Sequence, residues 1–216
     1  MNCIVWNCRG AGNTSTVRDL VAHTRAHSPS MIFLCETRQN KEKMYRLRNR
    51  VGLRGFEEVS SDGNSGGLAL FWDESLYVDI RDCNRRWIDA YVRLPADDQL
   101  WRITFVYGEP RVENRHLMWT KLQKLSTVSD LPWLVIGDFN EAMWSFEHFS
   151  DTPRSAGQML DFRDVLEVCG LGDLGFAGLS YTFDNRRGGR ANIKVRLDRA
   201  VANNMWRDVF AHARVA

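Results

Sequence analysis

Short apolar runs that end at polar or glycine residues recur along the chain and predict buried strands. The clearest run covers residues 133–136, which are bounded by Pro132 and Gly137 and rich in β-branched side chains. Further strands are predicted at residues 3–6, 31–35, 55–59, 67–72, 76–80, 86–94, 100–107, 180–183 and 194–201. Those over residues 76–107 alternate well enough to form an antiparallel meander.

Helical periodicity predicts four helices, at residues 14–27, 41–51, 114–127 and 157–169. Leu117 is expected on the apolar face of the third helix and Leu160 on that of the fourth. Strands outnumber helices, and helices fall between strands at both ends of the chain. This order favours an α/β fold with two packed mixed sheets and helices outside, a four-layer sandwich, over a single doubly wound sheet.

Composition bounds the class of protein. With 216 residues and 44% hydrophobic content, the chain can bury one sizeable core, and we expect residues 1–216 to form one domain. The five cysteines show no CxxC spacing, which indicates reduced thiols and no zinc site or disulfide frame. No apolar run approaches a membrane span, and Met1 leads straight into the first strand. We therefore expect no signal peptide or membrane anchor, and a nuclear or cytoplasmic protein.

Net charge is only +2, so overall charge does not argue for a polyanionic partner. Local clusters do. The first basic group comprises Arg38, Lys41, Lys43, Arg46, Arg48, Arg50 and Arg54. The second comprises Arg186, Arg187, Arg190, Lys194, Arg196 and Arg199. Such groups can neutralise a DNA backbone. The alternatives are a solvated helix face for the first group and a basic loop for the second.

Polar residues stand at the exits of four predicted strands: Asn7, Glu36, Tyr107 and the pair Asp138 and Asn140. Asp138 and Asn140 have the same parity, so in an extended chain both point to one side. Carboxylate and amide oxygens at strand ends suit a hard cation, a water or a phosphate oxygen. Each exit also has an ordinary reading, such as an Asx turn after the strand or a strand-end residue in water. Together, the four exits indicate one Mg²⁺–phosphate centre.

Eight segments occur in an order that carries a family resemblance. They are VWNCRG (5–10), LCET (34–37), GGLALFW (66–72), VYG (106–108), GDFNE (137–141), DLGF (173–176), SYTF (180–183) and RLDR (196–199). This set resembles the endonuclease/exonuclease/phosphatase superfamily, and within it the endonuclease domain of plant non-LTR (LINE-type) retrotransposon polyproteins. The resemblance implies a fold like that of apurinic/apyrimidinic endonucleases and deoxyribonucleases.

The resemblance also implies a metal site. Glu36 would be the principal Mg²⁺ ligand, assisted by Asn7, and Mn²⁺ would be a possible substitute. Mg²⁺ needs few carboxylates when water and substrate phosphate complete its coordination. Arg9 stands where some relatives carry an acid, which speaks against a second metal there.

Four further residues receive catalytic roles by the same resemblance. Asp138 would orient or deprotonate the attacking water, and Asn140 would hold that water or the scissile phosphate. Tyr107 would donate its hydroxyl to a phosphate oxygen, and Asp198 would orient a catalytic histidine. These roles serve stabilisation of the expanding phosphate anion and its leaving oxygen.

The chain departs from the family at its end. The family closes with a Ser-Asp-His triplet, whereas none of His23, His27, His116, His148 and His212 follows Ser-Asp here. His212 aligns with the run before the triplet and is not a substitute. We expect a C-terminally incomplete domain that lacks the last strand, leaves a sheet edge bare and has crippled or no activity.

The sequence thus predicts a Mg²⁺-dependent endonuclease that nicks one DNA strand and leaves a 3′-hydroxyl to prime reverse transcription. The domain would be monomeric, with no membrane partner, and followed by a reverse transcriptase region. Its DNA contacts would include Arg186, Arg187, Arg190 and Lys194. One alternative is a non-catalytic DNA-binding remnant. Another keeps the chemistry but acts on a phosphoinositide, sphingomyelin or RNA tail, as a superfamily phosphatase or nuclease.

Overall fold

The computed structural model describes residues 1–63, 65–95 and 98–216. The chain forms two compact units, Met1–Phe105 and Val106–Ala216. Whether residues 1–216 act as one domain stays a prediction.

The first unit alternates helices and strands before a run of strands. Its elements are β1 (Cys3–Asn7), α1 (Thr14–His27), β2 (Met31–Cys35), α2 (Lys41–Val51), β3 (Gly55–Val59), β4 (Leu68–Trp72), β5 (Tyr77–Cys83), β6 (Trp87–Arg93) and most of β7 (Trp101–Tyr107). All nine were predicted, with bounds within a few residues.

The second unit has longer connections and shorter strands. Its helices are α3 (Arg115–Ser126), α4 (Ala156–Val168) and α5 (Asn204–Val209), with 3₁₀ turns at η1 (Val112–Asn114), η2 (Ser145–Glu147) and η3 (Gly189–Ala191). Its strands are β8 (Trp133–Asp138), β9 (His148–Phe149), β10 (Gly172–Asp173), β11 (Phe183–Asp184), β12 (Lys194–Val195) and β13 (Asp198–Ala202).

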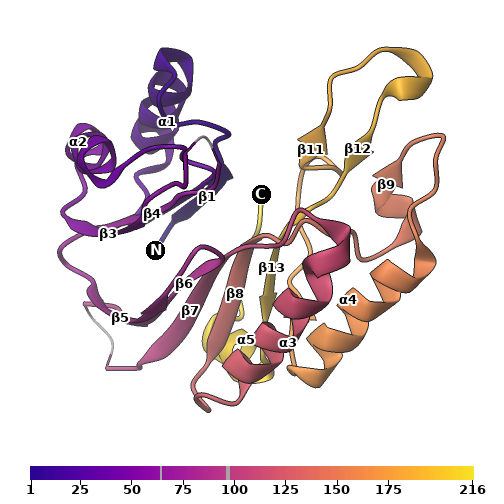
Figure 1. Cartoon of the computed structure of the whole chain (residues 1–216). Helices are drawn as coiled ribbons and strands as arrows, with labels where there is room; N and C mark the ends of the chain where they lie inside the picture. Colours follow the sequence, from indigo (N-terminus) through magenta and orange to yellow (C-terminus); the bar gives the residue numbers. More distant parts are fainter. Residues whose placement is uncertain (64, 96–97) are drawn as a thin grey trace. The chain divides into compact units, whose positions relative to one another are not determined.

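Strand β2 shows why the first unit is layered. Its side chains alternate between two buried faces, so the whole run is apolar. Ile32 and Leu34 pack in a cluster with residues of α1 and α2, which lie over one face of the sheet (Figure 1). Phe33 stacks on Phe105 of β7 with ring centroids 5.0 Å apart. Helices, a first sheet and strands of a second sheet therefore form successive layers.

Hydrogen bonding gives three sheets. The first has the order β1-β2-β4-β3, with β1 parallel to β2 and the other pairs antiparallel. The second has the order β10-β13-β8-β7-β6-β5, and a small third sheet has the order β11-β12-β9. The predicted α/β class, with two mixed sheets flanked by helices, is confirmed.

Aromatic stacking joins helices α3 and α4 in the second unit. Trp119 of α3 stacks on Phe162 of α4 at 4.9 Å between ring centroids, and Phe139 lies 5.3 Å from Phe162. The predicted apolar faces were wrong at one residue in each helix, because Leu117 is 51% exposed and Leu160 is 47% exposed.

One predicted strand, at residues 194–201, is two strands. Residues of β12 pair with β9 and β11, whereas β13 pairs with β8 and β10, so the chain changes sheets at Arg196 and Leu197. The strand predicted at residues 180–183 is reduced to β11, and α5 was not predicted. No helix in the described part of the chain is long and apolar enough to cross a membrane.

Candidate functional site

Asn7 and Glu36 meet at the ends of parallel strands in the first unit. Asn7 is the register partner of Cys35, so Glu36 directly follows the paired residues. The Asn7 amide Nδ2 donates a hydrogen bond to Glu36 Oε1 at 3.1 Å. The predicted neighbourhood of these two side chains is therefore present, although the residues lie 29 positions apart.

The backbone of Glu36 adopts a left-handed conformation, with φ at 52°. This conformation costs a residue with a Cβ about 1–3 kcal/mol, and such strain gathers at functional sites. The following loop is held by its own bonds, because the N–H groups of Thr37 and Arg38 donate to the carbonyls of Gly67 and Gly66 at 3.1 and 3.0 Å. The fold therefore fixes where the Glu36 carboxylate points.

Arg38 neutralises this carboxylate in the structure. Its Nη2 donates to Glu36 Oε2 at 2.8 Å, and the Glu36 side chain is only 18% exposed. Sequence reasoning did not single out Arg38 as a partner of Glu36. The spacing of two residues was the available signal, but it becomes a contact only because of the bend at Glu36.

The oxygen donors suit Mg²⁺ better than a softer metal. One carboxylate and one amide are few protein ligands, and Mg²⁺ keeps water and substrate oxygens for the remaining positions. Across residues 1–63, 65–95 and 98–216, no three His, Cys, Asp or Glu side chains gather into a metal cluster.

In the second unit, Asp138 and Asn140 form a closed turn. The backbone N–H of Asn140 donates to Asp138 Oδ1 at 2.8 Å, and its side-chain Nδ2 donates to the Gly108 carbonyl at 2.9 Å. Asp138 is buried, with 4% exposure, and Asn140 has φ at 56°. The Asx turn considered from the sequence is present. It fixes both side chains and is compatible with a catalytic role.

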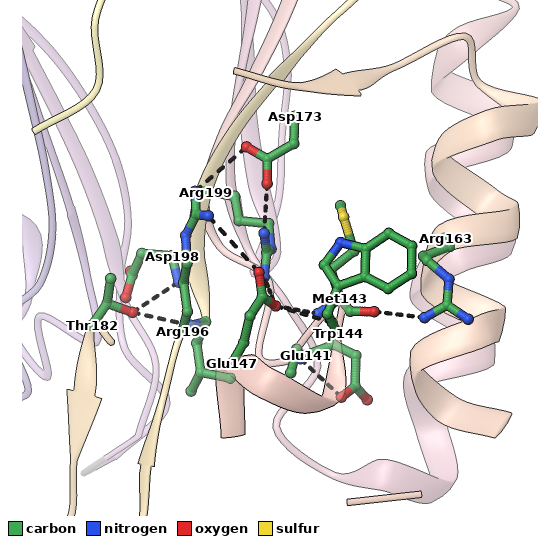
Figure 2. A network of polar contacts seen from close by, with 12 residues as sticks. Glu141, Met143, Trp144, Glu147, Arg163, Asp173, Thr182, Arg196, Asp198 and Arg199 are labelled. Carbon is green, nitrogen blue, oxygen red and sulfur yellow. Dashed lines mark hydrogen bonds and ion pairs between the residues drawn. The ribbon is translucent and has the colours of Figure 1, made fainter. Parts of the chain in front are cut away.

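Asp198 lies beside Asp138 across a strand pair. The two are register partners in the antiparallel ladder of β13 and β8. Thr182 Oγ1 accepts the backbone N–H groups of Leu197 and Asp198, both at 3.0 Å, as Figure 2 shows for the residues around this hydroxyl. Thr182 was not predicted as a site residue, although it belongs to the SYTF segment.

Tyr107 ends β7 and is 6% exposed. The next residue, Gly108, donates its N–H to the Asp138 carbonyl at 2.6 Å. Tyr107, Asp138, Asn140 and Asp198 thus belong to linked segments of the second unit. The convergence of this set with Asn7 and Glu36 stays a prediction.

Two arginines of the second basic group are buried ion-pair partners. Arg199 binds Glu147, and its Nη1 lies 2.6 Å from Asp173 Oδ2 (Figure 2). Arg196 lies 3.4 Å from Asp173 Oδ1 and 3.8 Å from Glu147 Oε1. The idea that these two contact DNA was wrong, because their exposures are 5% for Arg196 and 2% for Arg199.

The remaining basic side chains of that group stand on the hairpin of β11 and β12. Arg186, Arg187 and Arg190 are exposed, and Lys194 is half-buried with its Nζ 3.9 Å from Asp184. Asp184 Oδ1 accepts the N–H of Arg186 at 2.7 Å, and this bond is the main cause of a lowered pKa for the Asp184 carboxyl. The hairpin therefore presents its arginines on an ordered turn.

The first basic group lies largely on the exposed face of α2, where Arg46 pairs with Glu42 at 2.5 Å. This arrangement agrees with a solvated helix face. The five cysteines are free in the structure. Burial raises the pKa of the Cys3 thiol to about 12 and that of Cys8 to about 11, so neither is a ready nucleophile.

Comparisons with known proteins identify the family and the fold. The family model described as the endonuclease/exonuclease/phosphatase family matches residues 4–215. The apurinic/apyrimidinic (AP) endonuclease LMAP from Leishmania major has a similar structure, with a TM-score of 0.70, 18% identity, and coverage of 94% of this chain and 79% of that one. No curated protein matches the chain.

Two further solved structures are similar. The endonuclease domain of TRAS1, a telomere-specific non-LTR retrotransposon, has a TM-score of 0.64 and 16% identity, covering 94% of this chain and 84% of that one. The 3′-5′ exonuclease NExo from Neisseria meningitidis has a TM-score of 0.64 and 19% identity, and the alignment covers 94% of this chain and 87% of that one. At these identities, the likeness establishes the fold.

Proposed function

The chain belongs to the endonuclease/exonuclease/phosphatase family, and we propose that its reaction is Mg²⁺-dependent hydrolysis of a DNA phosphodiester that nicks one strand. The contact between Asn7 and Glu36 carries this proposal. It sets a carboxylate and an amide side by side at the exits of two parallel strands, on a backbone strained at Glu36.

In the proposed reaction, Glu36 and Asn7 would hold the cation. The Asn7 amide now turns its NH₂ toward Glu36, and rotation of this amide would present its oxygen instead. Arg38 holds Glu36 Oε2 at 2.8 Å, so Glu36 would have to exchange this partner in order to serve as a metal ligand. A bound Mg²⁺ supplies neutralisation of the phosphate charge that develops during hydrolysis.

The second unit provides the proposed groups that act on water and phosphate. Asp138 accepts a proton from, or orients, the attacking water, while Asn140 holds that water or the scissile phosphate. Tyr107 donates its hydroxyl to a phosphate oxygen. Asp198 would orient a histidine supplied by a Ser-Asp-His segment, which these 216 residues do not contain. We therefore infer low or no turnover for the 216-residue chain itself.

We further propose a LINE-type retroelement of plants as the source of the domain. In that setting the product 3′-hydroxyl primes reverse transcription, and a reverse transcriptase region follows in the polyprotein. The eight ordered segments and the similarity to the TRAS1 endonuclease domain support this assignment.

Nicking of supercoiled plasmid tests the proposal. The domain extended by its natural downstream residues should nick with Mg²⁺, and with Mn²⁺ in its place. Glu36→Gln and Asp138→Asn should each reduce nicking by a factor of about 10² or more. Glu42→Gln removes a carboxylate that is 70% exposed on α2 and should leave the rate unchanged. Nicking indifferent to both site substitutions would refute the proposed roles.

A second candidate function is DNA binding without turnover. The exposed arginines on the hairpin of β11 and β12 favour it, because they can contact phosphates whether or not hydrolysis follows. Salt-dependent duplex binding without nicking, even after extension with downstream residues, would support this candidate. The absence of binding at low salt would exclude it.

A further inference from the structure

An exposed aromatic turn follows the GDFNE segment in the second unit. Trp144 is 43% exposed, Phe146 is 71% exposed and Phe149 is 45% exposed, all within six residues. Each of these three rings keeps 43% or more of its surface exposed in the structure. Clustered exposed apolar side chains are a feature of interaction sites.

The turn is anchored from beneath by Glu147. Its buried carboxylate oxygen Oε2 accepts the N–H groups of Met143 at 2.7 Å and Trp144 at 3.1 Å, and the same oxygen binds Arg199 (Figure 2). Arg163 adds a second anchor, because its Nη1 donates to the Met143 carbonyl at 2.6 Å. The aromatic rings thus stand on a fixed backbone.

The rings of Trp144 and Phe146 are nearly parallel, and a cation lies against the Trp144 ring. The planes of Trp144 and Phe146 differ by 7°, with ring centroids 6.4 Å apart. The Arg163 guanidinium lies 4.4 Å from the centroid of the Trp144 ring, as Figure 2 shows for this pair. On the adjoining sheet, Lys194 lies 4.7 Å from the Tyr181 ring, which contacts Phe149 edge-on. Aromatic faces interleaved with cations are typical of surfaces that bind single-stranded nucleic acid.

We propose that Trp144 and Phe146 form a stacking platform for unpaired bases of the DNA substrate. The inference rests on the proposed function and narrows its substrate to DNA with strands separated near the cleavage site. Bases in an intact duplex stack on one another and cannot offer their faces, whereas unpaired bases can.

Chain length keeps the platform close to the proposed chemistry. Trp144 lies four residues after Asn140 and Phe146 lies six, so their Cα atoms are at most about 14 and 22 Å from that of Asn140. One strand of duplex DNA rises by about 3.4 Å per nucleotide. The platform therefore lies within about four to six nucleotides of the DNA position next to Asn140.

Equilibrium binding of the 216-residue chain to two labelled DNAs tests the proposal without requiring turnover. One is a fully paired duplex, and the other has the same sequence with a six-nucleotide unpaired bubble. The wild type should prefer the bubble. Phe146→Ala and Trp144→Ala should each weaken bubble binding by about 5- to 150-fold and leave duplex binding unchanged.

Two variants act as controls. Phe146→Trp retains an aromatic face and should retain the preference. Leu179→Ala removes an apolar side chain of matched exposure, 72%, from another loop and should bind both DNAs as the wild type does.

The outcomes separate this inference from the proposed function. Equal binding of duplex and bubble by the wild type, or bubble binding unaffected by both alanine variants, overturns the platform and leaves the endonuclease proposal standing. A self-association that Phe146→Ala abolishes, with unchanged binding of the bubble, also overturns it. If neither DNA binds at low salt, the platform is overturned, and the endonuclease proposal is decided by the nicking of the extended domain.

Discussion

Gly137 packs against the backbone of Val106. A Cβ at Gly137 would lie 2.1 Å from the Val106 carbonyl oxygen, far inside van der Waals contact, and the glycine has φ at +149°. No residue other than glycine fits there without displacing β7 from β8. This close approach immediately precedes Asp138, so the position of that carboxylate depends on the absence of a side chain one residue earlier.

Gly137→Ala should therefore destabilise the protein by about 1–3 kcal/mol or more, since backbone atoms cannot yield as a flexible side chain can. Urea unfolding measures the change. Gly188→Ala is the matched control, because no atom lies within 4 Å of its added Cβ. We expect the control to stay within about 0.5 kcal/mol of the wild type. Equal stability of the two variants would contradict the close packing.

Glu147, Asp173, Arg196 and Arg199 form a buried network of ion pairs. Substitution of Glu147 should lower the free energy of unfolding more than substitution of any other residue in this network. Glu147→Ala removes the acceptor of two backbone N–H groups and a partner of Arg199, whose side chain has no exposed surface. Breaking a buried ion pair from one side costs about 3–5 kcal/mol.

Glu42→Ala, which removes an exposed partner of Arg46, should cost about 0.5 kcal/mol or less. Thermal or urea unfolding of both variants compares the stability lost with the Glu147–Arg199 pair and with the Glu42–Arg46 pair. A loss at Glu147 as small as that at Glu42 would mean that water reaches the network.

Local pattern predicted the first unit well because its strands are buried on both faces or alternate regularly. It failed where pairing with distant strands determines which sheet a segment joins. Residues 194–201 look continuous in sequence, yet the chain leaves one sheet and joins another at Arg196 and Leu197. Leu117 and Leu160 were misplaced because an apolar residue one position beside the helix stripe looks the same in sequence as one inside it.

The candidate site was predictable to the same extent. Asn7 and Glu36 could be paired from their strand exits, and the contact is present. The left-handed backbone at Glu36 and Asn140 could not be read from residue type, since it depends on the loops that hold it. The prediction that the whole basic group at residues 186–199 contacts DNA was too broad. Sequence counts charge, whereas the fold decides that Arg199 is buried and Arg186 is not.

Charge neutralisation on the hairpin should change the salt dependence of DNA binding. Arg186→Gln with Arg187→Gln removes two exposed cations, so the slope of log K against log salt should become shallower by about 2. The slope is obtained from the DNA-binding constant measured at salt concentrations between about 50 and 200 mM. Arg18→Gln, at a 78% exposed side chain on α1, is the control. An unchanged slope in the double variant would remove the hairpin from the DNA interface.

His148 should make stability fall as the solution becomes acidic. Burial, with a smaller contribution from Arg154, lowers the pKa of this imidazole below its ordinary value near 6.5. Below about pH 6.5 the imidazole of the unfolded chain takes up a proton more readily than that of the folded chain. The contribution of neutral His148 to the free energy of unfolding is therefore complete above that pH and is lost as the pH falls below it.

His148→Gln should accordingly lose less stability than the wild type between about pH 7 and pH 5. Urea unfolding at each pH measures the difference, and carboxylates common to both proteins cancel. His212→Gln, at an exposed position, should follow the wild type. Parallel curves for His148→Gln and the wild type would contradict the lowered pKa.

Thr182 connects the SYTF segment to the backbone that carries Asp198. Its hydroxyl oxygen accepts two N–H groups, those of Leu197 and Asp198, at the point where the chain passes from β12 to β13. Thr182→Val keeps the shape of the side chain but removes the acceptor, so both amides lose a bond worth about 0.5–1.5 kcal/mol. Their hydrogen exchange should accelerate by up to about tenfold, because local opening becomes easier.

Thr182→Ser retains the oxygen and should restore protection of both amides. The Ala11 amide, which donates to the Thr37 carbonyl at 2.9 Å in the first unit, is an internal reference and should exchange equally in all three proteins. If the Leu197 and Asp198 amides alone respond, the hydroxyl positions the backbone of Asp198, and its effect is local. If all amides respond together, Thr182 contributes to general stability, and its assignment as a positioning residue for Asp198 would have to be abandoned.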